Sequence, residues 1–194
     1  VSGVLSSFKK PFDKVYWAEK KARDYGTSVD EVLTMWDDHR DASCYRGKNY
    51  HKIMEVFLLT GIREPGNDSL YDSVSANLNL LGEAKAIYAE RLLYTHAYKI
   101  AGTADVIIDH PFNQFSVMDF KTNKQFRYHS KYGEYLLAPV DHLQACEFNS
   151  YTLQLSLYAY MYSELTGRKL KAMSINFLDD EKQIWNNIPI HYMK

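Results

Sequence analysis

Apolar and polar residues recur with a helical period along the first sixty positions. Residues 12–25 mix aromatic and charged side chains at roughly helical spacing, and Ser28 with Glu31 forms the capping-box pattern that opens a helix. After Gly47, apolar residues at positions 50, 53, 54, 57 and 58 form a broad stripe, and Gly61 is well placed to end that helix. The pattern predicts two leading amphipathic helices and a third between Gly47 and Gly61.

The pattern becomes that of β-strands from residue 86. Residues 63–77 are rich in turn-forming side chains and predict a loop or a short surface excursion. The stretches 86–102, 103–109 and 115–121 are rich in β-branched and aromatic residues, and a turn at 110–113 separates the last two. We expect a meander of three or four strands here.

The last third of the chain returns to a helix and then to strands. Residues 123–149 form an irregular stretch longer than a routine loop, which is typical of a functional or mobile segment. A strongly apolar helix follows and ends at Gly167, and residues 169–178 and 184–190 predict two more strands. This order predicts an α/β protein with a mixed central β-sheet flanked by helices. We expect one domain over residues 1–194, with N-terminal helices at about 8–60, a catalytic meander at about 86–122, a helix at about 150–166 and C-terminal strands at about 169–190.

Composition narrows the possible functions. The 194 residues are 46% hydrophobic, enough for one globular domain with a real core. The formal net charge of -1 gives no global attraction for a polyanion, so nucleic acid would need a local groove and a metal ion. The two cysteines are too few for an iron–sulfur cluster or a four-thiolate zinc site and favour a reducing, cytoplasmic compartment. No apolar run approaches the ~20 residues of a membrane span, so we expect no membrane partner.

Two acidic residues carry the candidate chemistry. Asp105 lies in GTADVIID and Asp119 in VMDFKTN, where Lys121 follows two residues later and therefore points to the same strand face as Asp119. An unpaired carboxylate taken out of water costs several kcal/mol, so charges in the middle of a strand need a compensating partner. Hard oxygen ligands of this kind bind Mg²⁺ or Mn²⁺, and a nearby ammonium can stabilise charge that develops on a phosphate.

The motifs GKNYH, AER, GTADVIID, VMDFKTN and QLSLY, in this order, resemble the RecB-type exonuclease branch of the PD-(D/E)XK nuclease superfamily. The resemblance spans residues 47 to about 162 and extends loosely to nucleases encoded by bacteriophages. It implies a restriction-endonuclease-like core and a site that binds one or two Mg²⁺ or Mn²⁺ ions. Some members of the family carry an iron–sulfur cluster held by four cysteines, and this chain departs from them.

The resemblance also implies roles for individual residues. It makes His51, Asp105 and Asp119 the metal ligands, Lys121 the catalytic lysine, and Glu90 a support for the metal site or its waters. Gln154 and Tyr158 match the QxxxY helix motif, which holds the substrate backbone near the metal. The strand with Asp119 and Lys121 carries the DxK motif. We predict that three residues directly after it contact phosphate groups: Thr122, Lys124 and Arg127.

Each of these residues also has a structural interpretation that the sequence leaves open. Glu90 can be a solvated surface residue, and a lone helical histidine more often pairs with a neighbouring carboxylate. Gln154 and Tyr158 can be the polar edge of a core helix. Lys124, Arg127 and Lys131 can be solubilising loop charges. Aromatic residues in the same segment could stack on unpaired bases, but 14% of the whole chain is aromatic; these are Phe126, Tyr128, Tyr132 and Tyr135.

Together these patterns predict a metal-dependent DNA nuclease. We expect an exonuclease that acts on DNA ends or single strands in repair, recombination or phage DNA processing, in a bacterial cell or an infected host cell, with a helicase or a recombinase as a candidate partner. One alternative is a nucleic-acid-binding module of a recombination complex that has lost turnover. Another is a metal-dependent endonuclease that acts on DNA or RNA, because no motif reads a 2′-hydroxyl.

Overall fold

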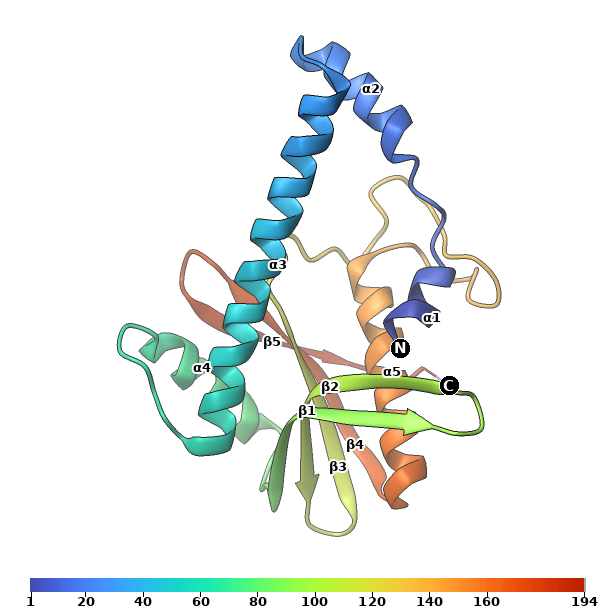
Figure 1. Cartoon of the computed structure of the whole chain (residues 1–194). Coiled ribbons are helices and arrows are strands. Elements are labelled where there is room, and N and C mark those ends of the chain that lie inside the picture. The colour runs from blue at the N-terminus through green and yellow to red at the C-terminus, as the bar shows by residue number, and fades with distance from the viewer. Residues whose placement is uncertain (194) are drawn as a thin grey trace.

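A single mixed β-sheet, with helices on both faces, organises the computed structural model, which describes residues 1–193 (Figure 1). The predicted α/β class and mixed sheet are confirmed. In chain order the elements are α1 (Ser2–Ser7), α2 (Lys14–Tyr25), α3 (Val29–Thr60), α4 (Asp68–Leu80), β1 (Ala86–Thr95), β2 (Ile100–His110), β3 (Gln114–Lys121), α5 (Glu147–Thr166), β4 (Lys169–Asp179) and β5 (Ile184–Ile190).

The sheet follows chain order, β1-β2-β3-β4-β5. All neighbouring strands pair antiparallel except β3 and β4, which are parallel. A parallel pair needs a long crossover, and here the irregular segment after β3 together with α5 supplies it. The meander predicted with three or four strands has three, and the two C-terminal strands and the irregular stretch are confirmed. The predicted run 86–102 is wrong as one strand, because a turn at 96–99 ends β1 and β2 begins at Ile100.

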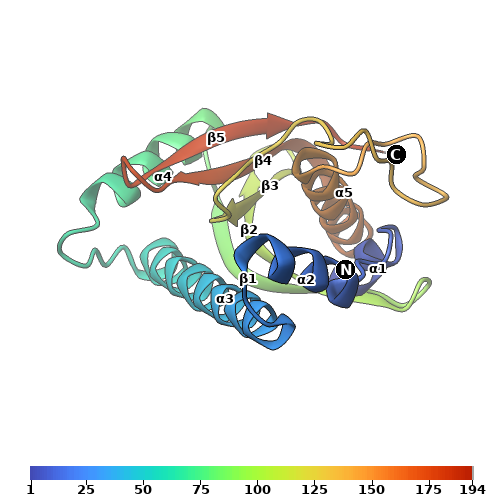
Figure 2. The same ribbon diagram turned by 90° about the horizontal axis from the view of Figure 1, so that it is seen from above.

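Alternating residues of the central strands pack into two separate hydrophobic cores, one on each face of the sheet. Ile107 and Val117 point to one face and pack with Leu155 of α5. Val106 and Met118 point to the opposite face and pack with α3 and α4, where Met54 is fully buried. Figure 2 shows α3 and α5 on different sides of the curved β1–β3 part of the sheet. A residue's position along a strand thus decides which helix it meets.

The region predicted as two helices around Gly47 is one helix. The capping box of Ser28 with Glu31 and the left-handed Gly61 (φ 72°) bound α3 as predicted, but the predicted break at Gly47 is wrong. A glycine inside a helix costs only about 1 kcal/mol, which the rest of a 32-residue helix outweighs. A Cβ at Gly47 would lie 3.2 Å from the Thr122 Oγ1 atom, so the glycine lets the end of β3 approach the helix.

The prediction of a loop over residues 63–77 is also wrong from Asp68 onward, because α4 begins there. Leu70, Tyr71 and Val74 are buried at helical spacing and pack under the sheet face that α3 also covers. The Asn77 amide donates to the Asn176 side chain (2.7 Å) and to the Trp185 carbonyl (2.8 Å), so α4 is fastened to β4 and β5.

The N-terminal segment runs back to the α5 side of the sheet. Helix α2 packs on the outer part of α3 through Ala18, Ala22 and Val32, and this pair stands well beyond the sheet (Figure 1). The Leu137 amide then donates to the Phe8 carbonyl at 2.7 Å, which ties the end of α1 to the irregular segment. None of the helices within residues 1–193 is both long and apolar enough to cross a lipid bilayer.

If α4 is part of the core, truncating a buried leucine in it must destabilise the protein much more than truncating an exposed one. Leu70 is fully buried and Leu80 is 72% exposed. We expect Leu70→Ala to lower the free energy of unfolding by about 2–5 kcal/mol and Leu80→Ala to lower it by less than about 0.5 kcal/mol, as measured by urea denaturation. Equal effects of the two substitutions would show that α4 does not contribute to the core.

Candidate metal centre

Three acidic residues lie at one level across neighbouring strands. The β1–β2 pairs Ala89–Val106 and Arg91–Ala104 flank Glu90 and place it opposite Asp105. The β2–β3 ladder ends at the Val106–Met118 pair, so Asp119 comes next to Asp105 on the other side. Glu90, Asp105 and Asp119 thus form a row across β1, β2 and β3, which we call the acidic row.

The backbone ladder is interrupted at the acidic row. Glu90 has a positive φ of 49°, which L-residues other than glycine seldom adopt, and it lies inside β1 without a ladder partner. On the other side, the Phe120 amide donates to the Asp105 Oδ2 atom (2.8 Å) in place of a backbone carbonyl. The β2–β3 ladder ends beside these residues, and we call the place where β2 and β3 separate the notch.

His51 of α3 enters this notch. Its Nε2 atom lies 3.1 Å from the Phe120 carbonyl, which can only accept, so we assign the proton to Nε2. The Nδ1 atom then points toward Asp105 Oδ2 at 3.4 Å and Glu90 Oε1 at 3.8 Å. Three electron-rich groups facing one another are stabilised by a positive charge, which either a proton on Nδ1 or a metal cation between them supplies. A hydrogen bond from the other ring nitrogen to a carbonyl is also the usual support of a metal-binding histidine.

The donor set fits a divalent cation. One atom each from His51, Glu90 and Asp105 lies within 4.8 Å of the other two. Carboxylate oxygens suit Mg²⁺ and Mn²⁺, and an imidazole tilts the preference toward Mn²⁺. Burial, and next the negative charge of Asp119, raise the pKa of Asp105 well above its usual range. A bound cation would stabilise the charged form of Asp105 and so oppose both the burial and the repulsion.

Asp119 is compensated differently. It is almost fully buried, and its Oδ2 atom forms an ion pair with the Lys121 ammonium. Burial alone would lower the pKa of Lys121, but the carboxylates of Asp119 and Asp105 outweigh it and raise the pKa, so the lysine stays charged. The Gln154 amide donates to Asp119 Oδ1 at 3.4 Å. The structure therefore groups Glu90 with His51 and Asp105, and the ligand role of Asp119 stays a prediction.

The QxxxY residues reach the site from α5. Gln154 Nε2 lies 3.4 Å from the Tyr158 hydroxyl as well as from Asp119, so both side chains share the helix face that looks at the acidic row. Gly102, the first residue of GTAD, makes this approach possible. A Cβ there would lie 3.0 Å from the Tyr158 ring and 2.8 Å from Val1.

The residues predicted to contact phosphate lie directly after β3, and their side chains differ in exposure and in partners. Lys124 is exposed, whereas Arg127 forms an ion pair with Glu147 that joins the irregular segment to the start of α5. The carbonyl of Thr122 accepts from Arg46 of α3. Of the loop aromatics, Phe126 packs against Tyr128, Phe148, Tyr151 and Phe177, whereas Tyr132 is 75% exposed.

Two residues with roles at the site were not singled out in the sequence. Arg46 also pairs with Asp180 and so fixes the end of β3 to α3 and to the β4–β5 turn. The Tyr151 ring lies 4.8 Å from the Lys121 ammonium, and its hydroxyl donates to Asn123 at 3.0 Å. Tyr151 precedes Gln154 by three positions, so helical spacing could have found it; the role of Arg46 had no local signal.

A cavity of about 410 Å³ opens beside the centre on the α3 side. Its lining includes His51 and Glu90 together with Lys48 and Lys52, which lie on the adjoining turns of α3. Glu55 lines it as well and pairs with Lys52 at 2.9 Å, so Lys48 is the cation of this lining that an anionic ligand could meet.

Comparison of the chain with protein-family models and with curated protein sequences finds no match. The geometry of the site is therefore the basis for the functional argument that follows.

The left-handed conformation of Glu90 makes a prediction about strain. A left-handed L-residue costs roughly 1–2 kcal/mol relative to glycine. In the presence of a chelator we expect Glu90→Gly to raise the free energy of unfolding by about 1 kcal/mol more than Glu90→Gln, because both remove the charge but only glycine relieves the backbone. Both variants should lose stabilisation by Mn²⁺ in thermal unfolding. If Mn²⁺ stabilises Glu90→Gln as much as it stabilises the wild type, Glu90 is not a ligand of the metal.

Proposed function

We propose that the protein is a divalent-metal-dependent DNA nuclease with a restriction-endonuclease-like core, of the RecB-type branch of the PD-(D/E)XK superfamily. The observation that carries the proposal is the convergence of His51, Glu90 and Asp105 on one point beside the Asp119–Lys121 ion pair. These side chains come from α3, β1, β2 and β3, which are far apart in sequence.

The arrangement of the motifs supports the family assignment. The side chains of all these motifs lie around one notch, although more than a hundred residues separate the first from the last. They are the helix histidine His51, the GxxD aspartate Asp105, the DxK pair Asp119 and Lys121, and the QxxxY residues Gln154 and Tyr158. Each motif used for the resemblance thus has a side chain in the same place. If these residues were only surface charges or packing residues, nothing would require their side chains to lie together.

The chemistry we propose is hydrolysis of a phosphodiester bond. A divalent cation held by His51, Glu90 and Asp105 would lower the pKa of water and offset phosphate charge. Lys121 keeps its proton beside Asp119 and is placed to stabilise the charge that develops on the phosphate. Gln154 fixes Asp119 and, with Tyr158, presents polar groups that would orient the sugar–phosphate backbone.

For the biological setting, we propose an exonuclease that acts on DNA ends or single strands in repair, recombination or phage DNA processing. A helicase or a recombinase is the corresponding partner. These assignments rest on the family resemblance, whereas the chemistry rests on the residues of the site.

The proposal is tested by incubating the protein with labelled single-stranded and double-stranded DNA in the presence of Mg²⁺ or Mn²⁺. We expect metal-dependent cleavage that Asp119→Asn and Lys121→Gln each lower by about 100-fold or more, the usual cost of losing a group that stabilises the transition state. Asp72→Asn removes an exposed carboxylate far from the site along the chain and should cleave like the wild type.

Circular dichroism confirms that each variant is folded before its activity is compared. Cleavage by Asp119→Asn at the wild-type rate would contradict the proposal, and so would DNA binding without cleavage under either metal. That second result would instead favour the binding module without turnover.

A further inference from the structure

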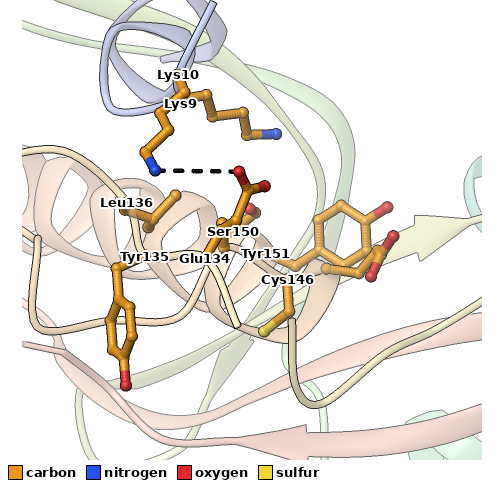
Figure 3. Close-up of a pocket in the computed structure, with 10 residues that line it drawn as sticks. Lys9, Lys10, Glu134, Tyr135, Leu136, Cys146, Ser150 and Tyr151 are labelled. Carbon is orange, nitrogen blue, oxygen red and sulfur yellow. Dashed lines mark ion pairs between the residues drawn. The ribbon is translucent and has the colours of Figure 1, made fainter. Parts of the chain in front are cut away.

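We infer that a second cavity, between the N-terminal segment and α5, binds the phosphate next to the bond that is cut, in an unpaired DNA strand. The inference rests on the proposed function and names its substrate more closely. The cavity has a volume of about 370 Å³, and Lys9, Lys10, Glu134, Ser150 and Tyr151 are among its lining residues (Figure 3).

This cavity adjoins the candidate metal centre. Tyr151 lines it, and the same ring lies 4.8 Å from the Lys121 ammonium, which pairs with Asp119. One aromatic ring therefore connects the cavity to the acidic row. A strand with one phosphate at the metal centre would carry its next nucleotide past Tyr151.

The cationic groups of the cavity are available to an anion. Lys10 lies 3.9 Å from Glu134, and both side chains are more than half exposed, so this pair is weak. Lys9 has no ion pair within residues 1–193. Glu147 also lines the cavity, but Arg127 engages its carboxylate. The lining itself holds two lysines and two glutamates, and with Arg127 engaging Glu147 the local balance is one positive charge, in contrast to the whole chain.

The two lysines are held in place and do not belong to a free end. The Leu137 amide donates to the Phe8 carbonyl (2.7 Å), directly before Lys9 and Lys10. The Tyr135–Gln144 bridge shapes the irregular segment that forms the opposite wall. Figure 3 shows the lysines reaching from the N-terminal segment toward the turn of α5 that carries Ser150 and Tyr151. This gives the long irregular segment a role as a cavity wall.

The size of the cavity favours a single unpaired nucleotide as its occupant. Ligand pockets hold roughly 300–1,000 Å³, so this cavity lies near the lower end of that range and has room for one nucleotide without its paired base. The cavity on the α3 side, with Lys48 and Lys52, is of similar volume. Lys52 pairs with Glu55 there, which leaves Lys48 as the cation on that side of the acidic row, and Lys9 and Lys10 as those on the α5 side.

The test measures binding of a short labelled oligothymidylate by fluorescence anisotropy over a series of salt concentrations, with Ca²⁺ in place of Mg²⁺. Each phosphate contact to a single strand contributes about 0.7 to the slope of log affinity against log salt. Because both lysines face the same phosphate, we expect Lys9→Gln/Lys10→Gln to reduce that slope by about 0.7 and to weaken binding. The matched control, Lys85→Gln/Lys169→Gln, removes the same charge at the opposite end of the sheet and should leave the slope unchanged.

A second arm locates the contact along the strand. A neutral methylphosphonate next to the cleaved bond should weaken binding by the wild type and have little further effect in Lys9→Gln/Lys10→Gln. A methylphosphonate several nucleotides away should affect both proteins equally. Duplex oligonucleotides should show no difference in slope between the wild type and the double variant.

The outcomes separate this inference from the proposed function, because cleavage with Mg²⁺ is measured in parallel. An unchanged slope in the double variant, with cleavage intact in the wild type, overturns the cavity assignment alone. A reduced slope without cleavage in the wild type supports the cavity as a strand-binding site and overturns the proposed hydrolysis. Absence of oligothymidylate binding by the wild type overturns both.

Discussion

Repulsion among carboxylates that cannot move apart is the constraint on which this site depends. The sheet register fixes Glu90, Asp105 and Asp119 at one level, and the buried Val106–Met118 pair directly beside them holds that register. Burial and the charge of Asp119 raise the pKa of Asp105 as a result. Asp109, in the same strand, shows the contrasting case: Tyr162 and Arg168 satisfy its carboxylate, and it needs no further partner.

The two faces of the sheet compensate the acidic row in different ways. From one side, α3 contributes His51, whose imidazole lies between Asp105 and the Phe120 carbonyl. From the other side, α5 contributes Gln154 against Asp119, while Lys121 pairs with Asp119 within β3. The row is thus divided into an aspartate paired with a lysine and two carboxylates that, with His51, could hold a cation. This division is what a metal-assisted reaction on an anion requires.

The fold and the site differ in how far the sequence predicts them. Strand alternation and the apolar period of α5 identified the meander, the last helix and the C-terminal strands, because local patterns determine those elements. Helix α4 was missed because Asp, Ser and Asn outnumber its buried positions, and only tertiary packing of Leu70, Tyr71 and Val74 decides the outcome. The close approach that suits a glycine at position 47 is to Thr122, which is distant in sequence, so the sequence shows the glycine as a helix break and not as a contact point.

At the site, the motifs located the participating residues but not their grouping. The structure brings Glu90 into the cluster because its left-handed backbone interrupts β1 opposite Asp105, which no sequence period reveals. Tyr151 and Arg46 act through contacts with Lys121 and Thr122 that only the folded chain creates. Local sequence thus predicts which side chains carry chemistry, and the sheet register decides which of them share an ion.

The central claim is that His51, Glu90 and Asp105 together bind one divalent cation. The most direct measurement is the anomalous scattering of Mn²⁺ in crystals of the protein soaked in that ion. The account predicts a peak bonded to the His51 Nδ1 atom and to the carboxylates of Glu90 and Asp105. Saturating Mn²⁺ that leaves this position empty, or binds only at other acidic residues, would contradict it.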